Sequence, residues 1–259
     1  MKLISRKAKA FFLSTTFFIV TLFLVFSLVY GIKYVCCIND NANIPIYSVD
    51  TDKKQLAITF DVAWGSENIN QILEILDKHN AKATFFLVGS WVDDNKELVE
   101  LIHEKGHEIG NHSNTHQNMK DMSDEDILNE IEITSEKIAN ITGERTTLFR
   151  PPFGEVDEDV MQVCDALDYT SIKWDLDSQD WKDLDSVHIV ERVCKGVHPG
   201  SIVLFHANSN NIEDYLDLIL TQLKNKGYSM VNVSELIYKN NYKVNSSGVQ
   251  KEVINWLIR

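Results

Sequence analysis

Cysteine and proline are both rare in this chain, with four of each among 259 residues. Four cysteines are too few for a disulfide scaffold, and Cys164 and Cys194 fall in apolar helical patterns that are typical of core residues. A disordered tail is also excluded, because 44% of the residues are hydrophobic and the composition is varied. The length suits one large domain with its own core, or at most two small domains.

Basic residues are in deficit as well. The chain has 25 Lys and Arg against 38 Asp and Glu, which gives a net charge of −13. A protein that binds nucleic acid needs a basic surface, so we expect no nucleic-acid partner. The deficit is uneven, because residues 1–35 contain five basic residues and no acidic residue.

Charge is absent from residues 10–30, where Phe, Leu, Val and Ile dominate. A helix of this length spans about 30 Å, which matches the hydrocarbon core of a bilayer. Four basic residues precede the run, so the positive-inside rule predicts a cytoplasmic N-terminus and an extracytoplasmic remainder. A cleaved signal peptide is the alternative, but the run is long for one and lacks a good cleavage site. We therefore expect a transmembrane anchor.

The predicted organisation has four parts. They are a basic tip with the transmembrane anchor (residues 1–35), a linker (36–53), a folded domain (54–239) and a C-terminal tail (240–259). The role of Cys36 and Cys37, just after the anchor, and the role of the tail do not follow from the sequence.

Within the folded domain, strand-like and helix-like apolar patterns alternate. Seven segments are predicted strands: residues 55–61, 82–88, 108–111, 148–150, 169–174, 201–206 and 228–233. Helical stripes lie between them, as in residues 123–141, where Ser123 is a predicted N-cap and Gly143 lies beyond the end. This alternation predicts a parallel α/β fold, although periodicity does not decide between a closed barrel and an open sheet.

Titratable side chains follow five of the predicted strands. They are Asp61, the pair His112 and His116, Arg150, the group Asp175, Asp177 and Asp180, and His206. The carboxyl ends of the strands are where an α/β barrel builds its active site. Together these side chains predict a single site at one rim.

Two of these positions carry recognisable chemistry. His112 and His116 are four residues apart, so on one helical turn they would share a face and bind one cation, usually zinc. Arg150 opens the run Arg-Pro-Pro-Phe-Gly, whose two prolines lack an N–H and leave the Phe153 amide as the next donor. One amide on a stiff loop is a good hydrogen-bond donor to an oxyanion, and the permanently charged Arg150 is a good partner for a carboxylate. A chance histidine pair and a turn with a surface arginine are the alternatives.

The acidic group lies between two tryptophans, Trp174 and Trp181. Tryptophan rings commonly line sugar sites, and a carboxylate beside a histidine raises the histidine pKa and determines its tautomer. His206 ends an apolar strand, where it is either such a partner or a buried histidine of the core. These features favour a sugar site with a histidine as acid or base.

Five short runs, in this order and spacing, match one protein family. They are Thr59-Phe60-Asp61, His112-Ser113-Asn114-Thr115-His116, Arg150-Pro151-Pro152-Phe153-Gly154, Asp177-Ser178-Gln179-Asp180-Trp181 and Leu204-Phe205-His206. On these runs, across about residues 55–237, the chain resembles the polysaccharide deacetylases of carbohydrate esterase family 4, the NodB homology domain. The resemblance implies an α/β fold, a distorted (β/α) barrel of about seven parallel strands.

The resemblance also implies how the acetyl group would be attacked. His112 and His116 would bind a divalent metal, zinc or else cobalt or another ion, which would polarise the acetamide carbonyl and a water molecule. Asp61 would be the general base, held by Arg150. The amide of Phe153 would stabilise the oxyanion.

The resemblance also implies which residues would help the amine to leave. His206 would protonate it, oriented by Asp180, while Trp181 and Leu204 would line the pocket for the acetyl group. The implied function is metal-dependent hydrolytic N-deacetylation of amino sugars in peptidoglycan or a related polysaccharide. With the anchor, this places the domain outside the cytoplasm, in the cell wall or spore envelope.

One position departs from the family pattern. The first motif usually reads Thr-Phe-Asp-Asp-Gly, and its second Asp is a metal ligand, whereas here that position is Val62. Valine cannot coordinate, so only two protein ligands remain, one fewer than a catalytic zinc site usually has. Water would fill the gap at weaker affinity; Asp61 itself, or less readily Glu67, is the alternative ligand.

Two functions therefore stay open. A start of the form Thr-Phe-Asp-x-x-Trp-Gly after an N-terminal anchor resembles the PdaB-like sporulation subgroup, which implies a deacetylase of spore peptidoglycan. The alternative is a catalytically impaired protein of the same fold that binds cell-wall glycan, because Val62 replaces a metal ligand.

Overall fold

The computed structural model describes residues 44–182 and 184–253. None of the helices in these residues is both long enough and apolar enough to span a membrane. The predicted anchor at residues 10–30 lies outside the described residues.

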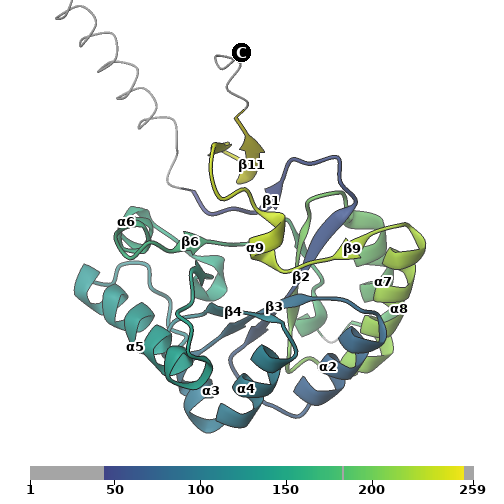
Figure 1. The fold of residues 1–259 in the computed structure, drawn as a ribbon, viewed down its shortest axis with the longest axis horizontal. Helices are drawn as coiled ribbons and strands as arrows, with labels where there is room; N and C mark the ends of the chain where they lie inside the picture. Colours follow the sequence, from purple (N-terminus) through teal and green to yellow (C-terminus); the bar gives the residue numbers. More distant parts are fainter. Residues whose placement is uncertain (1–43, 183, 254–259) are drawn as a thin grey trace, which may run out of the picture. The chain divides into compact units, whose positions relative to one another are not determined.

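A parallel sheet forms the centre of the described domain (Figure 1). Its strands are β2 (Gln55–Val62), β3 (Ala83–Leu87), β4 (Glu108–Asn111), β5 (Leu148–Phe149), β6 (Thr170–Ser171), β7 (Leu176–Asp177), β8 (Ile202–His206) and β9 (Ser229–Met230). Seven of them follow the order β6-β5-β4-β3-β2-β8-β7, and β9 pairs with the start of β2. The domain is therefore an α/β fold with a curled half-barrel of seven parallel strands.

The half-barrel differs from the predicted strand set at one edge. The seventh strand in the order is β7, which pairs with β8, whereas the predicted strand at residues 228–233 is the short β9 beside β2. β7 lies in the acidic segment after Trp174, where Leu176 stands between Asp175 and Asp177, so no apolar run marks it as a strand in the sequence. The curl stays open, because β6 and β7 form the two ends of the strand order.

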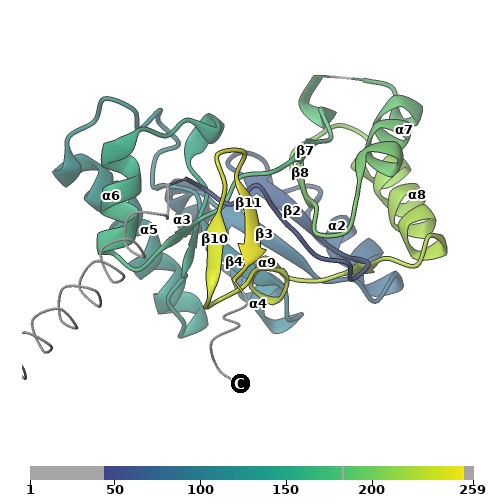
Figure 2. The same cartoon turned by 90° about the horizontal axis from the view of Figure 1, so that it is seen from above.

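Helices cover the outer side of the curl (Figures 1 and 2). They are α2 (Ile69–Lys78), α3 (Gly89–Asp94), α4 (Lys96–Glu104), α5 (Asp124–Thr142), α6 (Glu158–Ala166), α7 (Ser186–Gly196) and α8 (Ile212–Asn225). The short α9 (Val233–Leu236) instead packs on the inner side, where Val233 and Leu236 are buried with Ile46 and Val49. The predicted caps of α5 are confirmed, since the Ser123 side chain accepts a hydrogen bond from the Asp126 amide and Gly143 is left-handed with φ 78°. Cys164 and Cys194 are free and buried, as predicted.

The inner side of the curl is filled by the two ends of the described chain. Strands β1 (Ser48–Val49), β10 (Tyr242–Val244) and β11 (Val249–Glu252) form a second, three-stranded sheet. Ile46 and Val49 pack in the inner core with Val244. The predicted linker and tail therefore need correction over residues 44–53 and 240–253, because apolar side chains of both segments are buried in the domain.

Alternation along β2 positions the site. Phe60 and Val62 point into the outer core, between the sheet and the helices. Ala57 points the other way, into the inner core that the two ends of the described chain fill. Thr59 and Asp61 lie on the same face of the strand as Ala57. Asp61 is level with His206 of the neighbouring β8. Two groups that are far apart in the sequence thus reach the same rim.

Candidate active site

Asp61 and Arg150 form a buried ion pair beneath the rim. Nη1 of Arg150 donates to Oδ1 of Asp61 at 2.8 Å and to Oγ1 of Thr59 at 2.9 Å. Burial opposes ionisation of Asp61, but the charge and the hydrogen bond of Arg150, with the charge of the neighbouring His206, outweigh it and lower the pKa of the carboxyl. Asp61 is therefore held as an ionised carboxylate at neutral pH.

Arg150 is fully buried and supported on several sides. Its Nη2 donates to the carbonyl of Lys173 at 3.0 Å, and its guanidinium lies 4.0 Å from the centre of the Phe86 ring. A guanidinium fits such a site because it stacks on an aromatic face while its N–H groups bond in plane. Arg150 thus leaves Asp61 little freedom to rotate.

His112 and His116 come together, but not on a helix. They lie in the loop after β4, where Ser113 and His116 have positive φ angles of 64° and 57°. The predicted helical turn is therefore wrong, although the two ring centres are only 4.9 Å apart. The left-handed residues fold the loop back so that both rings meet.

Each histidine has one buried nitrogen, Nε2 of His112 and Nδ1 of His116, without a hydrogen-bond partner in the described part of the chain. Nδ1 of His112 is 2.6 Å from the carbonyl of Arg150, so it carries the proton and leaves a lone pair on Nε2. Burial lowers the pKa of both rings, that of His116 to about 4, so both are neutral at pH 7. These two nitrogens fit two ligands of a divalent cation, with the carbonyl as the outer partner that such ligands usually have.

A third protein ligand is not in place. Among the residues that the structure describes, no three His, Cys, Asp or Glu side chains form a group that could hold a metal ion. Val62 is fully buried in the outer core, and Glu67 folds back to accept a hydrogen bond from the Ser66 amide. Asp61 is engaged with Arg150, and its other oxygen, Oδ2, lies 3.4 Å from Nε2 of His112.

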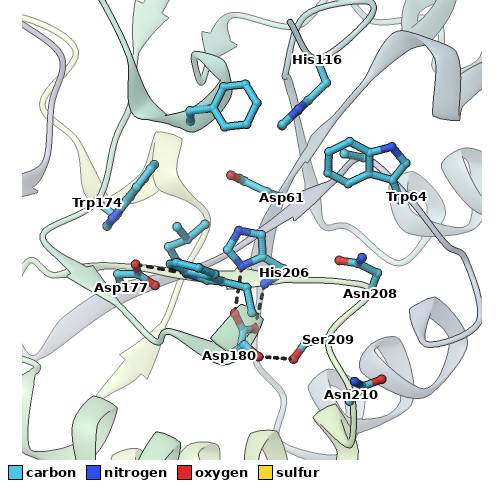
Figure 3. Close-up of a pocket in the computed structure, with 14 residues that line it drawn as sticks. Asp61, Trp64, His116, Trp174, Asp177, Asp180, His206, Asn208, Ser209 and Asn210 are labelled. Carbon is cyan, nitrogen blue, oxygen red and sulfur yellow. Dashed lines mark hydrogen bonds and ion pairs between the residues drawn. The ribbon is translucent and has the colours of Figure 1, made fainter. Parts of the chain in front are cut away.

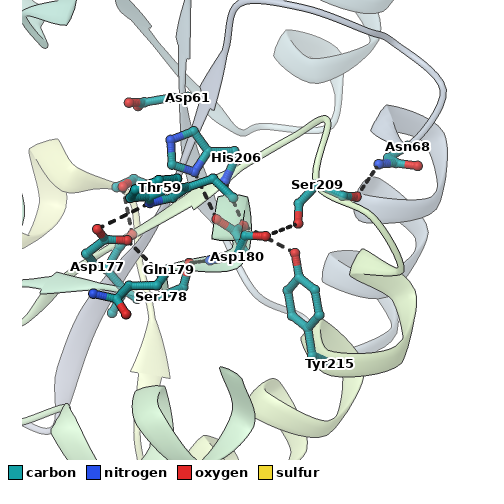
Figure 4. A network of polar contacts seen from close by, with 12 residues as sticks. Thr59, Asp61, Asn68, Asp177, Ser178, Gln179, Asp180, His206, Ser209 and Tyr215 are labelled. Atoms are coloured by element: carbon teal, nitrogen blue, oxygen red, sulfur yellow. Dashed lines mark hydrogen bonds and ion pairs between the residues drawn. The ribbon is translucent and has the colours of Figure 1, made fainter. Parts of the chain in front are cut away.

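His206 and Asp180 form a second hydrogen-bonded pair (Figure 4). Nδ1 of His206 lies 2.9 Å from Oδ1 of Asp180, while Oδ2 of Asp180 accepts from the His206 amide and from the Tyr215 hydroxyl. Asp180 itself lies in the short helix η2 (Asp180–Lys182), and its carbonyl accepts from Ser209. Both oxygens of Asp180 are thus used to orient His206.

Asp180 also sets the protonation of His206. Burial lowers the pKa of His206, but the hydrogen bond to Asp180 and the charge of Asp61 outweigh burial, so the pKa lies above its ordinary value. His206 therefore stays protonated to a higher pH than an ordinary histidine does.

One cavity of about 630 Å³ joins these groups (Figure 3). Its wall contains the predicted residues Asp61, His116, Phe153, Asp180, Trp181, Leu204 and His206. His112 and Arg150 lie behind this wall, in contact with Asp61. The structure therefore brings all nine predicted site residues to one place, while the role of each stays a prediction.

Some lining residues were not predicted. They are Ala63, Trp64, Asn208, Ser209 and Asn210. Trp174 and Asp177, which were predicted for the sugar site and for the rim, also line the cavity. Trp64 lies three residues after Asp61 of the first motif, so motif proximity was an available signal for it. No sequence pattern marks residues 208–210, which reach the cavity because the loop after β8 turns back beside the turn after β2.

Comparison with known proteins places this geometry in a family. The profile of the polysaccharide deacetylase family matches residues 48–172. The chain is 30% identical over 204 residues to peptidoglycan-N-acetylmuramic acid deacetylase PdaA of Bacillus subtilis. The aligned residues cover 77% of this chain and 78% of PdaA. It is also 36% identical over 183 residues to peptidoglycan-N-acetylglucosamine deacetylase PgdA of Listeria monocytogenes, covering 71% of this chain but only 39% of PgdA.

A solved structure adds a contrasting case. Wild-type BA3943 from Bacillus anthracis, described as a CE4 family pseudoenzyme, is 38% identical with a TM-score of 0.73, over 76% of this chain and 70% of BA3943. A mutant of BA3943 with restored enzymatic activity superimposes equally well. The chain is thus similar both to named deacetylases and to a pseudoenzyme.

Proposed function

The chain belongs to the polysaccharide deacetylase family, and from this premise we propose that it hydrolyses the acetamide bond of N-acetylated amino sugars in peptidoglycan. One observation carries the proposal: the Asp61–Arg150 pair and the His206–Asp180 pair face the same cavity. One pair suits a base and the other an acid, which is what hydrolysis of an amide requires.

Asp61 begins the reaction in this proposal. As an ionised carboxylate it accepts a proton from the water that attacks the acetamide carbon. Arg150 holds one carboxylate oxygen, so the other is left for the water. The tetrahedral oxyanion that forms is stabilised by the Phe153 amide. This amide lies in a tight turn, in which Phe153 has a left-handed backbone conformation with a φ of 61°.

His206 completes the reaction. The C–N bond breaks as protonated His206 donates to the amine nitrogen, which leaves as a free amino sugar, while the carbonyl carbon leaves as acetate. Asp180 holds the ring by Nδ1, so Nε2 is the donating atom. Trp181 and Leu204, which line the cavity, accommodate the acetyl methyl group.

A divalent ion, zinc or a related metal, is part of the proposal. His112 and His116 would hold it through the two unpartnered nitrogens. When bound, such an ion supplies Lewis-acid polarisation of the carbonyl and of water. With two protein ligands instead of three, its affinity is expected to be weak.

Acetate release tests the proposal. Full-length protein is expected to release acetate from peptidoglycan or N-acetylglucosamine oligomers when zinc or cobalt is added. Asp61→Asn keeps the size of the side chain but removes the base, so the rate is expected to fall at least about 100-fold. If folded wild-type protein released no acetate from any of these substrates, the proposal would be contradicted.

A second function is favoured by Val62 and by the similarity to a pseudoenzyme. In this alternative the protein binds cell-wall glycan on the same fold without hydrolysing it. Two ligands for a metal and a buried valine at position 62 are the observations in its favour.

Acetate release by the wild type separates the two functions, and Val62→Asp tests whether a third ligand is what the site lacks. The side chain at position 62 faces the outer core, where an unpaired carboxylate is costly, so we expect the new carboxylate to turn toward the two histidine nitrogens, tighten zinc binding and raise acetate release. Zinc affinity, measured by competition with a chelator, is the readout, and Val62→Asn is the matched control of similar size. Equal affinity in wild type and both variants would show that position 62 faces only the core.

We propose an extracytoplasmic location for the domain. The uncharged run at residues 10–30 with its basic flank supports a membrane anchor with a cytoplasmic N-terminus. Peptidoglycan of the wall or of the spore envelope is then within reach. The sporulation context rests on the resemblance of the first motif alone.

A further inference from the structure

Exposed aromatic side chains are concentrated at the cavity. Among the described residues, every exposed Phe, Trp or Tyr lines it: Trp64 is 61% exposed, Phe153 62% and Trp181 56%. Large apolar rings left in water at one place mark a binding surface. Phe153 and Trp181 belong to the motifs already assigned, whereas Trp64 has no role so far.

Trp64 stands on a firmly held turn. Nε1 of Trp91 donates to the carbonyl of Gly65 at 2.6 Å, and the Asn68 side chain donates to the carbonyls of Ala207 and Ser209. Gly65 has a φ of 68°, and a Cβ there would lie 2.8 Å from Oε2 of Glu67 and 3.3 Å from Cβ of Asn208. The turn is thus tied to α3 and to the loop after β8, so little backbone entropy is lost when a ligand contacts Trp64.

The position of Trp64 relative to the reacting groups is also informative. Its ring meets the His116 ring edge-on at 4.8 Å, and in Figure 3 it stands across the cavity from Trp174, with Asp61 and His206 between them. Trp64 lines the same cavity as Asp61 and His206, so it forms part of the wall around a glycan whose acetamide reaches those two groups. Sugars present a face of C–H groups ringed by hydroxyls, and such a face packs on an indole while the hydroxyls reach polar neighbours.

We propose that Trp64 is a stacking platform for a pyranose ring of the N-acetylated glycan, and so a determinant of substrate binding in this chain. The identity of the ligand as a glycan rests on the proposed function. The platform itself rests on exposure, on the held turn and on the place of Trp64 at the cavity. This stacking role is independent of whether the protein hydrolyses the glycan or only binds it.

Trp64→Ala and Trp64→Phe test this inference in the full-length protein. Calorimetry with the tetramer of N-acetylglucosamine is expected to show about tenfold weaker binding for Trp64→Ala and a smaller loss for Trp64→Phe, which keeps an aromatic face. Leu218→Ala is the control, because Leu218 is a similarly exposed apolar residue of α8 that does not line the cavity. Its glycan affinity is expected to equal that of the wild type.

Zinc affinity of the same variants distinguishes a structural role. If Trp64 only supports His116, Trp64→Ala would lose zinc affinity and keep its glycan affinity, which would overturn the inference. Failure of the wild type to bind the tetramer would overturn it too. A wild type that releases no acetate, with Trp64→Ala still impaired in glycan binding, would refute the deacetylase proposal and leave the platform standing.

Discussion

At the scale of single residues, Asp180 determines what His206 can do. It accepts from Nδ1 of the ring, from the His206 amide and from the Tyr215 hydroxyl. Its charge and its hydrogen bond together keep the pKa of His206 raised despite burial. In the proposed mechanism His206 must be protonated when the amine leaves, so we expect this carboxylate to set the alkaline limit of activity.

Asp180→Asn is expected to move the alkaline limb of the pH–rate profile to lower pH. The amide carries no charge, so the pKa of His206 falls and the ring loses its proton earlier as the pH rises. Acetate release measured between pH 6 and pH 10 checks this, roughly over the range in which a histidine with a raised pKa titrates. In the control Tyr215→Phe, Asp180 keeps its charge, so the limb should stay in place; equal limbs in wild type and Asp180→Asn would disprove the role of Asp180.

At the scale of elements, helix α5 holds the loop that carries the histidine pair. Glu130 of α5 accepts hydrogen bonds from the amides of Asn114 and Thr115 at 2.9 and 2.8 Å, and from the Thr115 hydroxyl. Lys137, two turns later, donates to the side chain of Asn114 and to the carbonyl of Gly89. The loop between His112 and His116 is therefore clamped by one face of a helix.

Glu130→Ala is expected to weaken zinc binding about tenfold, the lower end of what loss of an outer partner of a metal ligand costs. The amides of Asn114 and Thr115 would lose their acceptor, so the loop between the two histidines would be held less firmly. Chelator competition gives the affinity. Glu132→Ala, on the same helix but paired at the surface with Arg145, should leave it unchanged. Identical zinc affinity of Glu130→Ala and wild type would show that the loop holds its shape unaided.

At the scale of the whole described domain, the two ends of its described chain, near residues 48 and 250, close the inner core (Figure 2). Gln250 of β11 is fully buried, and its side chain bonds both the amide and the carbonyl of Tyr238 at 2.8 Å. β11 pairs with β1 on one side and β10 on the other. Residues near 48 and near 250 therefore stabilise each other, below the site.

Gln250→Ala is expected to lower the free energy of unfolding by about 2 kcal/mol, because two partly buried backbone groups of Tyr238 would lose their partners. Urea denaturation measures this change. The neighbouring Lys251 forms an exposed ion pair with Asp50, so Lys251→Ala should change stability by less than about 0.5 kcal/mol. A similar small effect of Gln250→Ala would mean that the second sheet is not coupled to the fold.

Predictability followed the length of each pattern. The eight-residue β2 and the 19-residue α5 were predicted well, since both carry several periods of apolar residues. Strands β1 and β7 were missed because they are defined by their partners in the sheet, whereas the equally short β5, β6 and β9 lie within predicted segments. The spacing of His112 and His116 suggested a helix, but two positive φ angles, which spacing does not reveal, make the loop instead.

By itself, the sequence determined the α/β class, the order of most strands and helices, and the nine candidate site residues, because periodicity and motifs are local. Tertiary structure decided which groups meet: Arg150 reaches Asp61 across 89 residues, and Asp180 reaches His206 across 26. It also decided that Val62 faces the outer core and that Trp64 stands at the cavity. These outcomes depend on the curl of the sheet and on the packing of its two faces, which arise only when distant segments come together.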